Sequence, residues 1–185
     1  MNVRLFDIEG LVLITPNVFG DDRGWFMESF NQDRFHKSVG ESLLFVQDNH
    51  SMSARVGTLR GLHYQAPPHA QDKLVRCVRG GIIDIAVDAR KSSPTFGQSV
   101  KVELTAENKQ QLLVPKGFLH GFITTQPDTE VEYKASDNYV PELDGSVSFA
   151  SPSLGLDWGT KQDAIHVSEK DKTAINFADW DSPFD

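Results

Sequence analysis

Strict alternation of apolar and polar residues is the feature that most constrains the fold of this chain. Residues 100–105 and 131–135 alternate at every position, and in residues 83–88 three aliphatic side chains share one face with Asp84 and Asp88 opposite. A period of two is that of a β-strand with one apolar face. Further β-rich runs cover residues 11–15, 25–30, 43–47, 74–78, 111–114 and 118–124.

Turn-forming residues separate these runs, for example Gly80-Gly81, Ser93-Pro94 and residues 115–117. Many short strands at near-regular spacing predict an all-β fold, an antiparallel sandwich or barrel. Helical patterns are few: residues 33–39 and a short segment that opens at Ser168. Without an internal repeat or a dividing linker, the 185 residues are expected to form one domain, 1–185.

Composition and charge exclude several classes of partner. The chain carries 18 Lys and Arg against 26 Asp and Glu, a formal net charge of −8, which disfavours nucleic acid and anionic membranes as partners. Asp7 and Glu9 interrupt the region where a signal peptide needs an apolar stretch. The lone Cys77 excludes an internal disulfide and suits a reducing compartment, so a cytoplasmic location is expected.

Two segments carry polar residues next to turns. Residues 61–65 are followed by Lys73, and residues 115–120 place a Pro-x-Gly turn ahead of a histidine. These segments resemble the signatures of the cupin superfamily, small jelly-roll barrels with a site in the barrel interior. Gln65 stands where the pattern usually has a second histidine, and Lys73 where it has a glutamate. Because an ammonium group repels a divalent metal, we expect no metal and no cofactor, and a site that holds a negative charge such as an enolate.

Six longer strings occur in order along the chain: residues 19–28, 47–51, 59–65, 73–75, 93–97 and 115–122. Together they resemble the dTDP-4-dehydrorhamnose 3,5-epimerase family, which inverts the carbons flanking the ketone of a nucleotide-bound 4-keto-6-deoxysugar. Six strings in register are not expected by chance, and they extend over most of the chain. The resemblance implies conversion of dTDP-4-keto-6-deoxy-glucose to dTDP-4-keto-L-rhamnose through an enolate, in dTDP-rhamnose biosynthesis.

The resemblance implies four catalytic residues. His63 is the base, because its unperturbed pKa of about 6.5 suits neutral pH, and Asp171 orients its ring. Lys73 holds the enolate oxygen, and Tyr133 is the acid on the opposite face of the sugar. The residues alone leave plainer readings open: a structural histidine, a capping-box acid after Ser168, a solvated lysine at a strand end and a core tyrosine.

The resemblance also implies a substrate-binding set. Arg23 and Arg60 would supply guanidinium forks for the pyrophosphate, and Tyr139 would stack on thymine. In a flat strand, Arg60 and His63 would face opposite sides, so we expect Gly61 to introduce a bulge that corrects the direction. The other binding positions are Phe26, Glu28, Gln47, Asn49, His120, Asp144 and Lys170.

Some features leave alternatives open. Asp144 stands where a glutamate is common in the family, and residues 148–152 depart from the usual string. Relatives with the same catalytic set can stop after one inversion, so an epimerase of one carbon and a 3,4-ketoisomerase are alternatives. A third hypothesis, a non-catalytic or metal-binding barrel, is disfavoured by Lys73.

The family resemblance carries an expectation about assembly as well. Barrels of this family generally form homodimers by exchanging N-terminal strands. We therefore expect a homodimer in which residues 11–30, with Arg23 and Glu28, reach the partner subunit's site.

Overall fold

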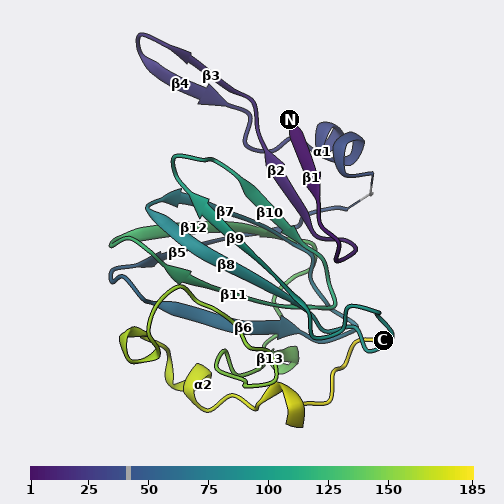
Figure 1. Cartoon of the computed structure of the whole chain (residues 1–185). Coiled ribbons are helices and arrows are strands. Elements are labelled where there is room, and N and C mark those ends of the chain that lie inside the picture. Colours follow the sequence, from purple (N-terminus) through teal and green to yellow (C-terminus); the bar gives the residue numbers. More distant parts are fainter. Residues whose placement is uncertain (41–42) are drawn as a thin grey trace.

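Two antiparallel sheets lie face to face and form a jelly-roll barrel of the cupin type (Figure 1). The computed structural model describes residues 1–40 and 43–185. The six-stranded sheet consists, in spatial order, of β1 (Asn2–Leu5), β2 (Val12–Thr15), β10 (Gln111–Val114), β7 (Lys73–Arg79), β12 (Thr129–Ala135) and β5 (Gln47–Ser53). The five-stranded sheet consists of β13 (Asp144–Ser146), β6 (Leu59–Gln65), β11 (Phe118–Thr124), β8 (Gly81–Asp88) and β9 (Ser99–Thr105).

The remaining two strands form a hairpin that projects away from the barrel (Figure 1). They are β3 (Val18–Asp21) and β4 (Gly24–Met27), paired from Val18 opposite Met27 to Asp21 opposite Gly24. The predicted all-β fold with few helices is confirmed.

Apolar side chains from both sheets fill the space between them. Val75 of β7 and Val131 of β12 lie in one buried cluster with Ile82 and Ala86 of β8. The side chains that point inward from the six-stranded sheet change from apolar to polar along the strands. Lys73 and Tyr133 occupy the next inward positions of β7 and β12. A polar cavity therefore opens at one end of an otherwise apolar sandwich.

Each sheet is also covered on its outer face. Leu113 and Val12 of the six-stranded sheet pack against Phe35 of α1 (Gln32–Val39). The five-stranded sheet buries its outward aliphatic residues, such as Ile85, under the C-terminal segment with Trp158 and Phe184. The yellow C-terminal segment in Figure 1 follows this face and carries α2 (Glu169–Lys172) and the short 3₁₀ helices η2 (Gln162–Ala164) and η3 (Phe177–Asp179), with η1 (Pro141–Leu143) preceding it.

The predicted helices are confirmed, and their ends have a local cause. Asn31 caps α1 by accepting a hydrogen bond from the backbone N–H of Arg34, and Gly40 ends it in the left-handed region, at φ 81°. Ser168 accepts from the backbone N–H of Asp171 and starts α2. The cap predicted at Ser168 is therefore present.

Two sequence-based predictions need correction. The strand predicted over residues 43–47 is wrong, since residues 43–46 have no regular structure and Phe45 packs on Phe30 and Phe35 instead. The strand predicted over residues 25–30 ends at Met27. In both cases the apolar side chains belong to a small aromatic cluster beside α1. Strand propensity favours the same residue types whether they pack in such a cluster or in a sheet, so it could not separate the two.

A bulge in β6 explains how Arg60 and His63 come to the same side. In the pairing of β11 with β6, His120 lies opposite His63 and Phe122 lies opposite Arg60, so two residues of β6 face Gly121 alone. Gly61 has φ +135°, and a Cβ there would lie 2.5 Å from the Cα of Gly121. Only glycine fits this backbone. The bulge expected at Gly61 is confirmed, and both side chains line one cavity.

We expect Gly61→Ala to destabilise the protein strongly, because the new methyl group meets backbone atoms of β11 rather than a movable side chain. The free energy of unfolding should fall by about 3 kcal/mol, measured by urea denaturation. Gly155→Ala is the matched control, since Gly155 also has a positive φ of +57° but a Cβ there would have no atom of the described residues within 4 Å. Equal losses for the two variants would contradict this role of Gly61.

Candidate active site

A cavity of about 470 Å³ lies between the two sheets at the polar end of the barrel. Strands of both sheets and the segment that precedes α2 form its walls. Four residues predicted to be catalytic line it together, as do three of those predicted to bind substrate. The full lining is Ser51, Thr58, Leu59, Arg60, His63, Lys73, His120, Phe122, Tyr133, His166, Val167, Ser168, Lys170 and Asp171.

The first wall carries a carboxylate–imidazole pair. Nε2 of His63 on β6 lies 2.6 Å from Oδ1 of Asp171 on α2. Asp171 is only 3% exposed. Burial pushes its pKa upward, but the hydrogen bond and the charge of His63 outweigh burial and hold the pKa below its usual value. Asp171 therefore stays ionised at neutral pH and fixes the orientation of the imidazole, with the second ring nitrogen left for a ligand.

The capping box and the carboxylate–imidazole pair are compatible. The backbone N–H of Asp171 donates to Oγ of Ser168, the cap of α2, while the Asp171 carboxylate contacts His63. Asp171 thus takes part in the helix cap and also orients the imidazole of His63.

The opposite wall presents an ammonium group and a phenol. Nζ of Lys73 lies 5.8 Å from the ring centroid of Tyr133. Burial lowers the pKa of Lys73 to about 8, although the charges of Asp144 and Asp84 oppose this. Burial also raises the pKa of Tyr133, so the phenol keeps its proton at neutral pH. Both side chains line the cavity, and Tyr133 also packs against the buried apolar cluster between the sheets.

His120 and Arg60 complete the floor of the cavity. Nε2 of His120 lies 3.0 Å from each carboxylate oxygen of Asp84, and both residues are buried. Arg60 donates from Nε to Oγ of Ser53 and from a terminal nitrogen to the carbonyl of Met52. The guanidinium group is therefore held by β5 across the gap between the sheets.

The rim of the cavity is a chain of polar contacts. Lys170 pairs with Asp144, whose carboxylate also accepts from the Tyr139 hydroxyl at 3.2 Å. The side-chain carbonyl of Gln47 accepts from the backbone N–H of Tyr139 at 2.9 Å, and its amide donates to Asn49 at 3.0 Å. Five residues predicted from the sequence to bind substrate thus form one connected edge beside the cavity.

Three predicted binding residues lie elsewhere. Arg23 and Phe26 are on the projecting hairpin, and Glu28 follows β4. The Arg23 side chain is 89% exposed and pairs with Asp21, and Glu28 contacts Arg34 at 3.1 Å. Within one protomer, none of the three lines the cavity.

Sequence reasoning missed several lining residues. Ser51, Thr58 and His166 line the cavity without belonging to a predicted role, and Phe122 contributes an apolar patch. Ser51 alternates inward on β5 with Gln47 and Asn49, so the period of that strand was a usable signal. His166 is held at the site by an isolated β-bridge to Thr58. The two residues are 108 positions apart, so no local sequence pattern could predict their pairing.

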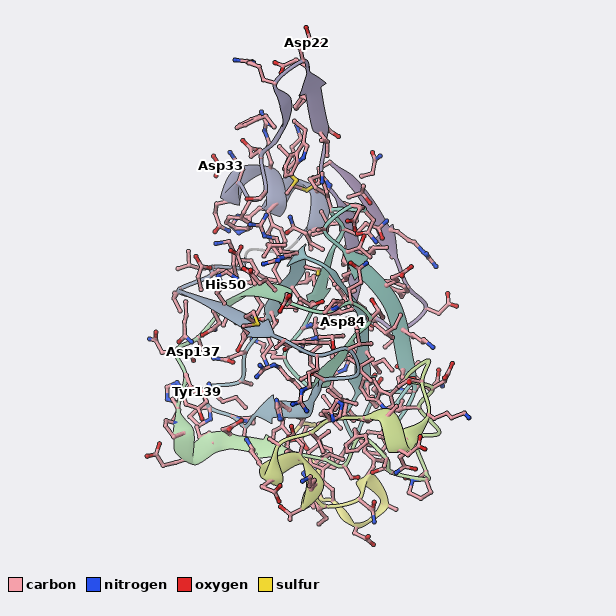
Figure 2. All side chains as sticks on the ribbon, turned by 90° about the vertical axis from the view of Figure 1, so that its left-hand side faces the viewer. Asp22, Asp33, His50, Asp84, Asp137 and Tyr139 are labelled. Carbon is pink, nitrogen blue, oxygen red and sulfur yellow. The ribbon has the colours of Figure 1, made fainter. Side chains whose placement is uncertain are left out.

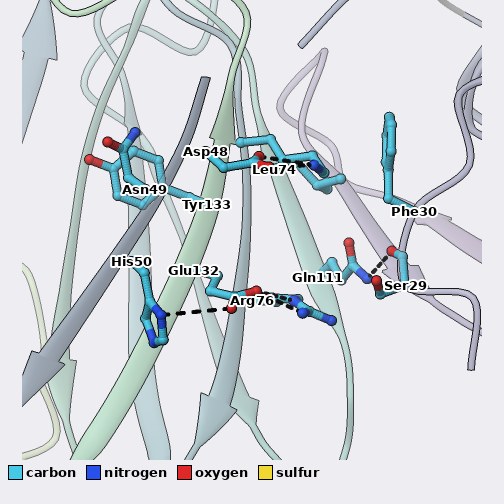
Figure 3. A pocket seen from close by; sticks show the side chains of 11 residues that line it. Ser29, Phe30, Asp48, Asn49, His50, Leu74, Arg76, Gln111, Glu132 and Tyr133 are labelled. Carbon is cyan, nitrogen blue, oxygen red and sulfur yellow. Dashed lines mark hydrogen bonds and ion pairs between the residues drawn. The ribbon is translucent and has the colours of Figure 1, made fainter. Parts of the chain in front are cut away.

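A second cavity, of about 440 Å³, lies mainly on the outer face of the six-stranded sheet (Figure 3). Its charges are paired: Arg76 donates to Glu132 at 2.7 Å, and Glu130 lies 2.9 Å from His50. Gln111 donates to the carbonyl of Ser29. Among the described residues, Tyr133 lines this cavity as well as the first one, whereas His63, Lys73 and Asp171 line only the first.

The residue at the second metal-ligand position of the cupin pattern has a structural role. Gln65 donates to the carbonyl of Asn138 and accepts from the backbone N–H of Val140. Over residues 1–40 and 43–185, no group of three His, Cys, Asp or Glu side chains has a geometry that holds a metal ion. In the same residues, no helix is long and apolar enough to cross a membrane.

Comparison with known proteins agrees with this geometry. The family model described as dTDP-4-dehydrorhamnose 3,5-epimerase matches residues 6–179. A Pseudomonas aeruginosa protein of that name is 50% identical over 181 residues, 98% of each chain. The crystal structure of a Legionella pneumophila 3,5-epimerase in complex with dTDP-4-keto-L-rhamnose is 42% identical, with a TM-score of 0.92 over 97% of this chain and 94% of that chain.

A more distant structure matches as well. The 3'-monoepimerase of Streptomyces bikiniensis in complex with dTDP-quinovose is 34% identical, with a TM-score of 0.85 over 94% of this chain and 86% of that chain. Together, the match of the family model over most of the chain and the high identities show that this chain belongs to the dTDP-4-dehydrorhamnose 3,5-epimerase family.

Proposed function

We propose that the protein inverts C3 and C5 of dTDP-4-keto-6-deoxy-glucose and yields dTDP-4-keto-L-rhamnose. The observation that carries the proposal is the arrangement of His63 and Tyr133 on opposite sheets, on either side of one cavity that also holds Lys73. An inversion needs a base on one face of a carbon and an acid on the other. It also needs an electrophile for the intermediate.

The same residues give a balanced reaction. His63 removes the proton from the carbon next to the ketone, and the electron pair moves to the ketone oxygen to give an enolate. The ammonium group of Lys73 stabilises that negative oxygen in a site withdrawn from water. Tyr133 returns a proton to the opposite face of the carbon, so the net change is inversion. His63 then loses the abstracted proton to solvent and Tyr133 regains one from solvent, which restores both groups. A second cycle at the other carbon completes the reaction.

The polar rim is suited to the nucleotide end of this substrate. Arg60 supplies a guanidinium group for a phosphate oxygen, and Lys170 adds a second cation near the rim. The exposed ring of Tyr139, held by hydrogen bonds to Gln47 and Asp144, offers a face for the base. The free, buried thiol of Cys77 supports action in the reducing cytoplasm, where we place the protein.

A homodimer is part of the proposal. The hairpin β3–β4 carries Arg23 and Phe26 away from the cavity of its own protomer (Figure 1). It also exposes large apolar side chains, with Phe26 70% and Phe19 64% accessible. Such a patch is typical of a protein interface. In the dimer, the hairpin would bring Arg23 to the partner subunit's cavity.

Two related reactions use the same groups. Inversion of a single carbon needs no different residue, and a related structure is named a 3'-monoepimerase. A 3,4-ketoisomerase would need a similar base but a different destination for the proton. The inward Tyr133 favours epimerisation, because it places an acid across the cavity from the base.

Solvent-exchange measurements test the reaction directly. In heavy water, we expect deuterium at both C3 and C5 of the recovered sugar, detected by NMR. His63→Asn should slow turnover about 10³-fold because the base is lost. His69→Asn is the matched control, since His69 forms a similar pair with Asp137, at 3.0 Å on the surface. Full retention of hydrogen at both carbons would reject the proposed reaction, and label at one carbon alone would assign a monoepimerase.

The pH dependence tests the role of Lys73. Because the buried ammonium has a pKa of about 8, it is charged below that pH and neutral above it. The kcat should therefore decline as pH rises through about 8. Lys73→Met should lower kcat about 10²-fold to 10³-fold at pH 7. Lys134→Met, which removes a lysine paired with Asp48 at the sheet surface, should leave kcat unchanged, and equal losses would refute the assignment.

Complementation tests the placement of Arg23. We expect Arg23→Ala and His63→Asn each to be poorly active alone. If Arg23 acts on the partner subunit's site, an equal mixture after subunit exchange should recover about a quarter of the wild-type rate, since half the dimers carry one complete site. Action within one protomer would give no recovery. Sedimentation as a monomer would also argue against the dimer.

A further inference from the structure

Asp84 is a buried charge that the proposed reaction leaves without a role. It lies on β8, is 0% exposed and has the core residues Ile82 and Ala86 as its inward neighbours along the strand. Figure 2 labels it in the interior of the barrel, far from the surface positions Asp22 and Asp137. Removing a carboxylate from water costs several kcal/mol unless it is paired. A residue in this position therefore calls for an explanation.

A role in stabilising the strand does not explain why Asp84 is buried. Asp88, also 0% exposed on β8, accepts hydrogen bonds from Arg90, Ser93 and Thr95 and so ties down the loop that follows the strand. Among the described residues, the Asp84 carboxylate accepts only from His120. Its one hydrogen-bonding partner lines the cavity. The two aspartates thus share a strand and a degree of burial but contact different parts of the molecule.

The pairing of β11 with β6 places two carboxylate–imidazole pairs next to each other. His120 of β11 lies directly opposite His63 of β6 in the sheet. Each imidazole is held by a buried carboxylate, Asp171 for His63 and Asp84 for His120. Both of Asp84's oxygens lie 3.0 Å from Nε2 of His120. This contact fixes the ring and its tautomer, so the other nitrogen is available to the cavity.

Asp84 also acts on the opposite wall. Its charge favours the ammonium form of Lys73, as does that of Asp144 at the rim, whereas Lys170 opposes it. The other charged or titratable groups that line the cavity are His63, His120, Tyr133, Arg60, His166 and Asp171. The partner of Asp84 on β9 is the apolar Val102. Asp84 is therefore the fully buried anion among the groups that support Lys73.

We propose that Asp84 is a positioning residue of the reaction, which holds His120 in register with His63 and fixes the tautomer of the His120 ring. It acts through His120 and does not itself line the cavity. This inference rests on the proposed function, because it concerns the same site. It adds a second carboxylate–imidazole pair to the pair that the base requires.

The test compares Asp84→Asn with Asp88→Asn by kcat and by nitrogen NMR of the histidine rings. Loss of the Asp84 carboxylate should lower kcat about tenfold and leave the His120 ring as a mixture of two tautomers. Asp88→Asn should lower the melting temperature and leave kcat and the His120 tautomer unchanged, since the Asp88 carboxylate bonds to the loop that follows β8. An unchanged kcat and an unchanged His120 tautomer in Asp84→Asn, or equal changes in Asp88→Asn, would overturn the proposal.

A measurement on the unaltered protein covers the case in which Asp84→Asn does not fold. Nitrogen NMR of the histidine rings should show His120 protonated at Nε2, with slow exchange, throughout the pH range of activity. A ring protonated at Nδ1 alone would overturn the pairing. If the wild-type protein fails to incorporate deuterium, the proposed function fails, while the NMR result still decides the contact between Asp84 and His120.

Discussion

An ammonium group inside a β-sandwich is stable only where carboxylates offset its lost hydration, and Lys73 imposes this requirement at one end of the barrel. It takes the inward position next to the core residue Val75, and burial brings its pKa down to about 8. Asp84 and Asp144 oppose that change from two different strands. The polar end of the sandwich is thus organised around the Lys73 ammonium group, and Arg60 and Lys170 add positive charge to the same cavity.

The covering of the five-stranded sheet links stability with chemistry. Both faces of this sheet are apolar, so the C-terminal segment has to pack on the outer one, with Trp158 and Phe184 buried against it. The same segment carries Asp171 to His63 at the edge of the sheet. Packing of the segment therefore also sets the orientation of the His63 ring, through a contact between residues 108 positions apart.

The sequence was a good guide to the strands and a partial guide to the site. Alternation identified the inward row of β12, and the motifs identified His63, Lys73 and Tyr133, which share one cavity. Asp84 shows the limit of this reasoning. It lies opposite the aliphatic face of β8, which suggests exposure, yet it is fully buried because both faces of that sheet are covered. Alternation with a period of two shows which side chains share one face of a strand. It does not show which segments of the chain cover that face.

The projecting hairpin shows why a single protomer leaves the binding set divided. A two-stranded hairpin is marginal alone, and this one contacts the barrel through the ring of Trp25, 3.9 Å from Nζ of Lys109. Its exposed aromatic residues need an apolar partner, and a guanidinium group such as that of Arg23 is stabilised beside a phosphate. In the proposed dimer, one docking of the hairpin would cover its aromatic side chains and bring Arg23 to the partner subunit's cavity, so assembly and substrate binding would depend on the same hairpin.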